Sequence, residues 1–170
     1  RALSLPQVTI APGEHLAALH VGREGVVATM ERAPGDWRIF LNNNYTLGGS
    51  RGQVAQERLG LLPLLLHGHP KTAATLGIAT GGTLGGASLM PGLERIDAIE
   101  LSPLVLRHAE RFFGPYSREV FRDPRCHLIC EDARWVMARE PGAYDVVIGD
   151  LFVPWRTGDG RLFTREHFEN

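Results

Sequence analysis

The sequence predicts an α/β domain built on a parallel sheet and preceded by a small β-rich lobe. Strand-like and helical runs alternate from residue 72 to residue 149, and such alternation indicates parallel strands joined by right-handed crossovers. Short strand-like runs without helices fill the first third of the chain. With 170 residues, 44% of them hydrophobic and 22% charged, the chain is long enough to bury a core of its own.

The first 50 residues are predicted to form an N-terminal β-hairpin lobe. Apolar and β-branched residues gather in three short runs, which glycine and proline separate. The runs are residues 15–21, 26–30 and 37–41. Three asparagines at 42–44 tolerate left-handed backbone and therefore predict a turn after the third run. Gly48 and Gly49 are expected to loosen the chain before the next element.

Residues 51–170 are predicted to form the larger α/β domain. It begins with a helix over residues 53–67, whose apolar residues lie on more than one side. This pattern predicts a helix buried between two substructures. The strands expected after it are residues 72–78, 95–100, 126–130 and 144–149. The helices expected between them run from the glycine cluster to about residue 89 and over residues 104–113 and 133–139.

Composition and charge argue against several classes of protein. The 18 basic and 19 acidic residues leave a net charge of −1, so a global basic field for a nucleic-acid partner is absent. The most apolar stretch, Leu59–Leu66, is broken by Pro63 and is much shorter than the roughly 20 residues of a membrane span. Cys126 and Cys130 would lie about 13 Å apart along one strand, too far for a disulfide. We therefore expect reduced thiols and a cytoplasmic location.

A glycine-rich turn is expected where the first parallel strand becomes a helix. Its candidate ligand-binding positions are Gly77, Ala79, Gly81 and Gly82. Glycines allow a ligand to approach the backbone closely, and free N–H groups favour its polar atoms. Glu100 ends the next strand, about 20 residues on, where an acidic side chain can accept hydrogen bonds from both ribose hydroxyls. The alternative is an exposed acid at a strand end.

Further acidic residues follow the third and fourth strands. Asp132 has two compatible interpretations: it could bind an adenine amino group, or it could cap the helix that starts at residue 133. Asp150 ends the fourth strand. Because ligands of open α/β sheets bind at the carboxyl ends of the strands, Glu100, Asp132 and Asp150 predict a nucleoside site with an acidic opening. The turn departs from Gly-x-Gly-x-x-Gly, so a nucleoside carrying a cationic sulfur suits the site better than a dinucleotide.

The chain resembles the spermidine/spermine synthase family, within the class I S-adenosylmethionine-dependent methyltransferase-like fold. It looks most like the branch in which this domain is fused to membrane-spanning segments. The matching stretches run through nearly the whole chain in family order. They are residues 23–25, 28–29, 41–43, 62–67, 77–86, 99–103, 123–125, 131–134, 144–150, 154–155 and 162–166. The resemblance implies a Rossmann-like parallel sheet in residues 51–170.

By this resemblance, Glu100 would bind the ribose, Asp132 the adenine side, and the glycine turn the rest of the nucleoside. Glu131, beside Asp132, is counted with these residues. Asp150 stands at the first aspartate of the family's Asp-x-x-Asp catalytic motif. Glu57 retains a family glutamate of the acceptor site. Trp155 has two interpretations: it could form a wall of the active site, or it could be an aromatic residue packed in a loop.

Four positions depart from the family pattern. Val153 occupies the place of the second catalytic aspartate, and Thr80 stands where the family has an aspartate in the glycine loop. Ala55 replaces a substrate-contacting tyrosine, and Thr46 replaces a glutamine. The polyamine pocket therefore differs from the family's, whereas the nucleoside half is intact.

The resemblance implies a transferase that uses S-adenosylmethionine or decarboxylated S-adenosylmethionine as co-substrate and passes an aminopropyl group to a small-molecule amine. The alternatives are a methyltransferase and a catalytically silent nucleoside-binding domain of a membrane protein. No metal is expected, since His67 and His69 lack further ligands at a suitable spacing. The chain starts at Arg1 and ends before the family's last strands. A fragment is therefore expected, whose sheet edge is either exposed or covered by a second copy in a homodimer.

Overall fold

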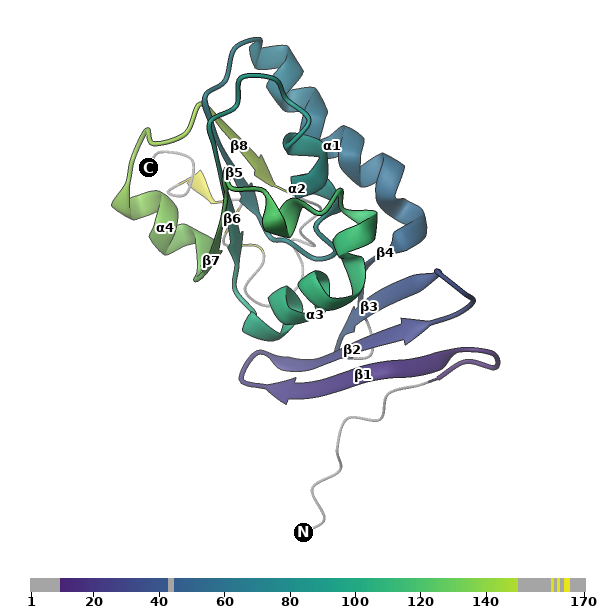
Figure 1. The fold of residues 1–170 in the computed structure, drawn as a ribbon. Helices are drawn as coiled ribbons and strands as arrows, with labels where there is room; N and C mark the ends of the chain where they lie inside the picture. The colour runs from purple at the N-terminus through teal and green to yellow at the C-terminus, as the bar shows by residue number, and fades with distance from the viewer. Residues whose placement is uncertain (1–9, 43–44, 150–159, 161, 163, 166–170) are drawn as a thin grey trace.

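The computed structural model describes residues 10–42, 45–149, 160, 162, 164 and 165, and Figure 1 shows their arrangement. They form two four-stranded sheets, one antiparallel and one parallel. Asp150, Val153 and Trp155 lie outside the described residues. The α/β class with an N-terminal β-lobe, expected from the alternation of strand and helix patterns, is confirmed.

The N-terminal lobe is an antiparallel meander with the strand order β1-β2-β3-β4. Its strands are β1 (His15–Gly22), β2 (Gly25–Glu31), β3 (Trp37–Leu41) and β4 (Tyr45–Gly49). The sequence did not predict β4. Its two glycines are needed because neighbours come close: a Cβ on Gly49 would lie 2.7 Å from the carbonyl oxygen of Trp37, and one on Gly48 would lie 2.9 Å from Thr80. Glycine, which disfavours strands in general, here permits the pairing with β3.

The second sheet is parallel throughout, with the strand order β7-β6-β5-β8. Its strands are β5 (Thr72–Leu76), β6 (Arg95–Glu100), β7 (Cys126–Cys130) and β8 (Val146–Gly149). The helices are α1 (Gln53–His67), α2 (Gly82–Ala87), α3 (Pro103–Phe113) and α4 (Ala133–Arg139). Three short 3₁₀ helices complete the described elements: η1 (Ser50–Gly52), η2 (Gly114–Tyr116) and η3 (Val120–Arg122). The order 3-2-1-4 along the sheet, counted from β5, is the expected Rossmann-like arrangement.

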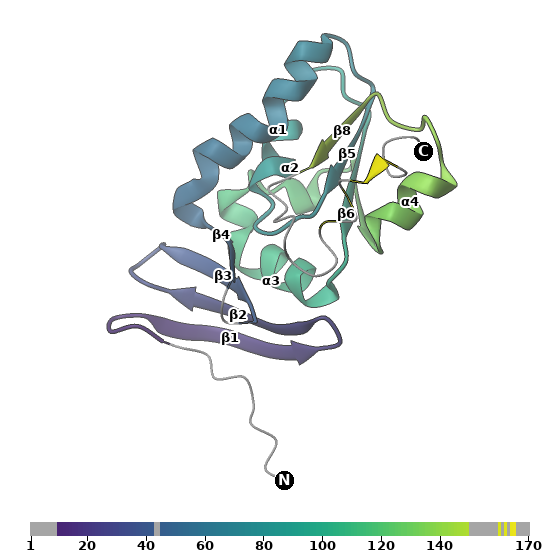
Figure 2. The same ribbon diagram turned by 180° about the vertical axis from the view of Figure 1, so that it is seen from behind.

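Helices cover both faces of the parallel sheet. Leu64 of α1, Leu84 of α2 and Ala109 of α3 belong to one buried cluster with strand residues, so these three helices share a face. Val136 of α4 packs on the other face, and Figure 2 shows α4 across the sheet from α1. A third cluster, with Ile39 of β3 at its centre, joins the lobe to α3. The lobe is thus fixed to the helix that follows the end of β6.

The expectation that α1 is buried between two substructures is wrong. Within the described residues, only Gly60 and Leu64 of this helix are buried. Leu62, Leu65 and Leu66 are exposed by 53%, 52% and 87%. The helix packs tightly along one face only, where a Cβ on Gly60 would lie 1.9 Å from a backbone oxygen of α2. No helix in the described part of the chain has the length and apolarity needed to cross a bilayer.

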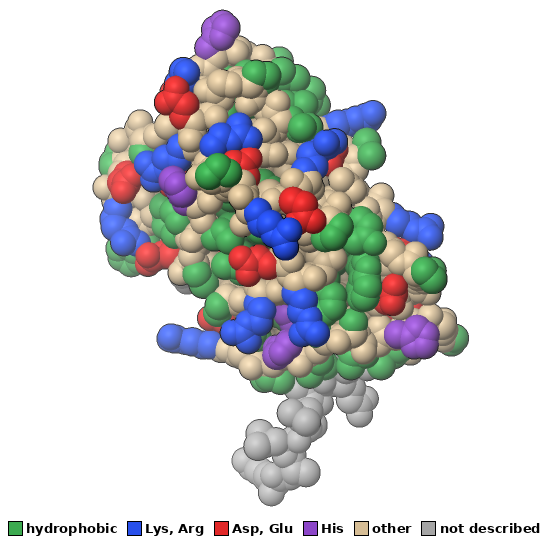
Figure 3. Space-filling view, viewed as in Figure 1, with side chains coloured by type: hydrophobic (Ala, Val, Ile, Leu, Met, Phe, Trp, Pro, Cys, Tyr) green, Lys and Arg blue, Asp and Glu red, His purple; other side chains and the backbone are tan. Residues whose placement is uncertain are grey.

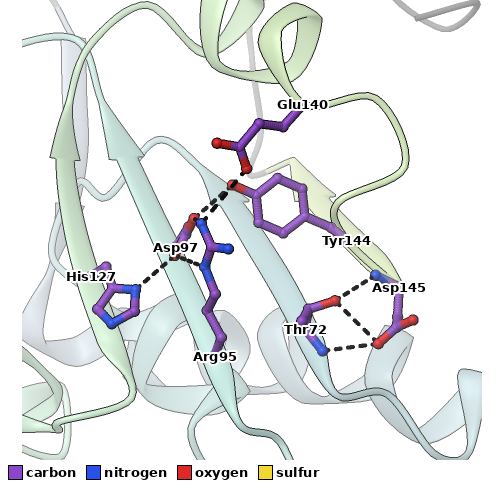
Figure 4. A network of polar contacts seen from close by, with 7 residues as sticks. All are labelled: Thr72, Arg95, Asp97, His127, Glu140, Tyr144 and Asp145. Atoms are coloured by element: carbon purple, nitrogen blue, oxygen red, sulfur yellow. Dashed lines mark hydrogen bonds and ion pairs between the residues drawn. The ribbon is translucent and has the colours of Figure 1, made fainter.

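A buried carboxylate ties the strands together on the α4 face (Figure 4). Asp97, with a fully buried side chain, accepts hydrogen bonds from Arg95 Nε at 2.9 Å and from the Tyr144 hydroxyl at 2.7 Å. His127 Nδ1 lies 3.1 Å from the same carboxylate. Burial opposes the charge of Asp97, but the bonds from Arg95 and Tyr144 outweigh it and hold its pKa below the ordinary value. Beside this network, Asp145 accepts from the backbone N–H of Thr72 at 2.9 Å and thereby links β5 to the start of β8.

Candidate functional site

The carboxyl ends of the parallel strands bring the sequence-predicted residues to one edge of the sheet. Glu100 is the last residue of β6, and the neighbouring strand β7 ends at Cys130, its register partner. Asp132 follows two residues later. On the other side of β6, β5 leads directly into the glycine turn. Glu100, Asp132 and the turn therefore lie at the same end of three adjacent strands, as the sequence predicted.

The Glu100 carboxylate is bound by the backbone on both sides. Its Oε2 accepts from the N–H of Ile78 in the glycine turn at 3.0 Å, and its Oε1 accepts from the N–H of Ser102 at the start of α3 at 2.9 Å. The backbone N–H groups of Ala79 and Leu101 also favour the charged form of the carboxylate and lower its pKa. Burial raises the pKa of Glu100 against these bonds, which favour its charged form. Since two carboxylate oxygens offer about four acceptor positions and the bonds from Ile78 and Ser102 use two of them, acceptor positions for two ribose hydroxyls are left.

Left-handed backbone shapes the turn that Glu100 holds. Gly77 and Gly81 each have φ of 80°, and Ala79 between them has φ of 50°. Gly77 N–H donates to the carbonyl of Ile99 at 2.8 Å, which places the turn beside the end of β6. An alanine in this region carries strain that its surroundings must balance, and the bonds of Ile78 N–H to Glu100 and of Gly81 N–H to the Ile78 carbonyl hold the turn on either side of it.

Gly81 and the glycines of α2 have a packing role that the sequence interpretation did not include, while ligand binding at Gly81 and Gly82 stays a prediction. A Cβ on Gly81 would lie 2.6 Å from the Phe121 ring, and one on Gly82 would lie 2.4 Å from Gln56. Gly85 and Gly86 face backbone instead: a Cβ added there would lie 2.6 and 2.1 Å from carbonyl oxygens of neighbouring segments. At these four positions, the space that glycine leaves is filled by the protein itself.

Asp132 caps α4, which confirms one of its two interpretations. Its Oδ1 accepts from the backbone N–H of Arg134 at 3.0 Å. The Arg134 guanidinium also grips both carboxylate oxygens, at 3.0 and 2.5 Å. Adenine binding by Asp132 stays a prediction, and the ion pair reduces the negative charge that Asp132 contributes to the edge.

Arginines also pair with the two other acidic residues predicted for the site. Glu131 is ion-paired with Arg139 of α4. Glu57 accepts from both Nε and Nη2 of Arg118, at 2.8 and 2.9 Å. Among the four predicted carboxylates that fall within the described residues, Glu100 alone forms no ion pair. The acidic opening expected from the sequence is therefore reduced there to one uncompensated carboxylate, and oppositely charged side chains are interspersed on the surface in Figure 3.

Thr80, at the family's aspartate position, makes a neutral contact. Its hydroxyl donates to Gln56 Oε1 at 2.8 Å, which ties the turn to α1. Ala55 and Thr46, the other departures in this part of the chain, are exposed. The sequence interpretation missed Gln56 and Arg118, because their partners lie 24 and 61 residues away and no local pattern marks them. In the described residues, no group of three metal-binding side chains comes together.

The chain is similar in sequence to known proteins. Residues 52–170 match the family model described as "Spermine/spermidine synthase domain". The chain is 27% identical over 117 residues to the polyamine aminopropyltransferase of Sodalis glossinidius, covering 69% of this chain and 40% of that protein. It is 36% identical over 115 residues to putrescine N-methyltransferase 1 of Nicotiana tabacum, covering 66% of this chain and 30% of that protein.

A solved structure shows the same fold. Spermidine synthase from Thermotoga maritima superposes with a TM-score of 0.79 at 22% identity, over 91% of this chain and 51% of that one. The chain thus spans between 30% and 51% of these relatives' lengths. The family match covers most of the chain, including the turn, Glu100 and both neighbouring strands. The chain belongs to the spermine/spermidine synthase domain family.

Proposed function

We propose that the chain is the nucleoside-binding part of a transferase that binds S-adenosylmethionine or its decarboxylated form, and that it passes an aminopropyl group from the decarboxylated form to an amine. One observation carries the proposal. The uncompensated Glu100 carboxylate bridges the glycine turn and the start of α3 at the carboxyl end of the sheet, with acceptor positions left for two hydroxyls. A single negative charge there also favours a ligand whose sulfur is positive.

The transfer would proceed by displacement at carbon. The lone pair of the amine forms a bond to the methylene next to the sulfonium, while the C–S bond breaks and its electrons stay on sulfur. The amine must first lose a proton, which costs roughly 4.6 kcal/mol at pH 7 for a pKa near 10.4. Glu57 and Glu131 are held by arginines, which supports Asp150 as the acceptor of that proton. Alignment of the two reactants would supply much of the rate.

Methyl transfer to an amine is the second candidate, and a specific observation favours it. The sequence identity is 36% to the tobacco putrescine N-methyltransferase and 27% to the bacterial aminopropyltransferase reported above. The family's loop aspartate is also replaced by Thr80, whose hydroxyl is engaged with Gln56. Fusion to membrane-spanning segments stays a prediction, as does the catalytically silent alternative.

Calorimetry with S-adenosylmethionine and with its decarboxylated form tests the proposal. We expect Glu100→Ala to weaken binding roughly 10- to 150-fold, because a charged acceptor of hydroxyl hydrogen bonds is lost. Glu94→Ala is the matched control, since Glu94 is an exposed acid paired with Lys71 at the opposite end of the strands. Equal affinity of the Glu100→Ala variant and the wild type would remove the assigned site.

Turnover distinguishes the three functions. Putrescine and other amines are incubated with each donor, and mass spectrometry identifies the group added to the amine. Aminopropylated product from the decarboxylated donor supports the first proposal, and methylated product from S-adenosylmethionine supports the second. Binding of a donor without product across the amine panel supports the catalytically silent nucleoside-binding domain.

A further inference from the structure

An ion pair joins two segments that pack on neighbouring faces of α2. Arg118 lies between η2 and η3 and donates to both carboxylate oxygens of Glu57 on α1, at 2.8 and 2.9 Å. Gln53 donates to the same carboxylate at 2.8 Å. The Glu57 side chain is 13% exposed and that of Arg118 is 45% exposed. The hydrogen bond from Arg118 holds the pKa of Glu57 below its ordinary value, so the pair is charged at neutral pH.

The two joined segments are the ones that fill the space left by the glycines. On the α1 side, the carbonyl oxygen of Glu57 would lie 2.1 Å from a Cβ on Gly86. On the other side, the carbonyl oxygen of Ser117 would lie 2.6 Å from a Cβ on Gly85, and the Phe121 ring abuts Gly81. The turn and α2 therefore lie between two walls, α1 and residues 117–121. The Arg118–Glu57 pair links one wall to the other.

The backbone at this link is strained. Arg118 and Glu119 have φ of 58° and 53°, two successive side-chain-bearing residues in the left-handed region. Such residues persist where surrounding contacts hold them. Glu119 N–H donates to the carbonyl of Gly114 at 2.9 Å, and Ser117 Oγ donates to the carbonyl of Phe113 at 2.9 Å. These bonds are local, whereas the guanidinium of Arg118 attaches the segment to α1.

We propose that Arg118 is a positioning residue: by pairing with Glu57, it clamps α1 and residues 117–121 around α2 and so holds the turn over residues 77–82 in its ligand-binding form. The inference rests on the proposed function. It also reassigns Glu57, which the resemblance placed in the acceptor site. Both Glu57 oxygens are engaged, and the adjacent guanidinium repels a protonated amine.

Amide hydrogen exchange of the unliganded protein tests the clamp without any ligand. In the Arg118→Gln variant, the amides of residues 77–87 should exchange faster than in the wild type. Arg122→Gln is the matched control, because Arg122 lies four residues away with an 84% exposed side chain and a contact to Glu119 at 3.6 Å. Unchanged exchange in the Arg118→Gln variant overturns the proposal.

Affinity and kinetics supply the second readout. Binding of S-adenosylmethionine should weaken roughly 3- to 10-fold in the Arg118→Gln variant. Arg118→Lys should recover part of this affinity, because lysine restores the positive charge but not the two parallel hydrogen bonds of the guanidinium. If the unpaired charge of Glu57 unfolds the Arg118→Gln variant, the double variant Glu57→Gln/Arg118→Gln removes that charge and can be measured instead. It should show the same loosening of the turn.

Kinetics with the amine acceptor distinguish a clamping role of Glu57 from a role in binding the acceptor. Glu57→Gln should weaken nucleoside binding and leave the KM for putrescine unchanged. A raised KM with unchanged nucleoside affinity overturns the clamp and returns Glu57 to the acceptor site. A wild-type protein that binds no S-adenosylmethionine refutes the proposed function instead, and the exchange comparison still decides whether the clamp exists.

Discussion

A buried histidine between the lobe and α3 should make the stability of this protein depend on pH. His108 is 1% exposed, and its two ring nitrogens lie 2.7 Å from Thr29 Oγ1 and 2.8 Å from His20 Nδ1. Burial lowers the pKa of His108 to about 4, and the nearby charges of His20, Arg111 and Arg107 act in the same direction. The folded state therefore favours the neutral form of the His108 ring.

The sign and size of this pH dependence follow from the linkage between proton binding and folding. The unfolded chain binds a proton at His108 near pH 6.5, and the folded protein does so only near pH 4. Unfolding thus takes up a proton within this window, so the free energy of unfolding falls as the pH drops through it. Between pH 7 and pH 5, the loss due to His108 alone is about 2 kcal/mol.

Urea denaturation of the wild type and of His108→Gln, each at pH 7 and pH 5, measures this contribution. The variant is less stable at pH 7 by roughly 1–3 kcal/mol, because Thr29 and His20 lose a partner. Its further loss at pH 5 should be smaller than that of the wild type by about 2 kcal/mol. His69→Gln, at an exposed position, controls for removing an imidazole as such. Equal losses in the wild type and the His108→Gln variant would refute the reasoning.

Two further substitutions probe the packing of the α/β domain. Gly60→Ala should lower the free energy of unfolding by about 3 kcal/mol, since the new Cβ would lie 1.9 Å from the carbonyl oxygen of Thr83. Gly52→Ala is the control and should change this free energy little, because its nearest neighbour lies at 4.0 Å. Similar urea midpoints for the two variants would contradict this account. Tyr144→Phe should cost roughly 1.5–3 kcal/mol in the same assay, because the buried Asp97 carboxylate loses a hydrogen bond of 2.7 Å, and wild-type stability would show that this bond contributes nothing.

Local pattern was sufficient to predict the parallel half of the fold. The bounds predicted for β6, β7 and α4 are those of the structure, because each run has one consistent period and clear ends. Asp132 marked the start of α4 through capping, an interaction that spans only two residues. Glu100 was likewise found from its place after a strand and its distance from the glycine turn.

Interactions between distant segments were not predictable in this way. β4 contains two glycines that a single sequence marks as a break, and only the close approach of Trp37 and Thr80 explains them. The exposure of the α1 leucines depends on what packs against each face, which periodicity does not report. The pairing of Glu57 with Arg118 depends on a contact between residues 61 positions apart, so Glu57 was assigned without its partner and Arg118 was missed.

Tight packing at Gly60, Gly85 and Gly86 bears on how relatives of this protein should be compared. A related protein without catalytic activity would still need these glycines, because any side chain at these positions would collide with the backbone. Their presence in a distant homologue therefore reports an inherited scaffold and says nothing about turnover. Glu100 is the more informative position, since among the described residues no neighbouring cation requires its charge.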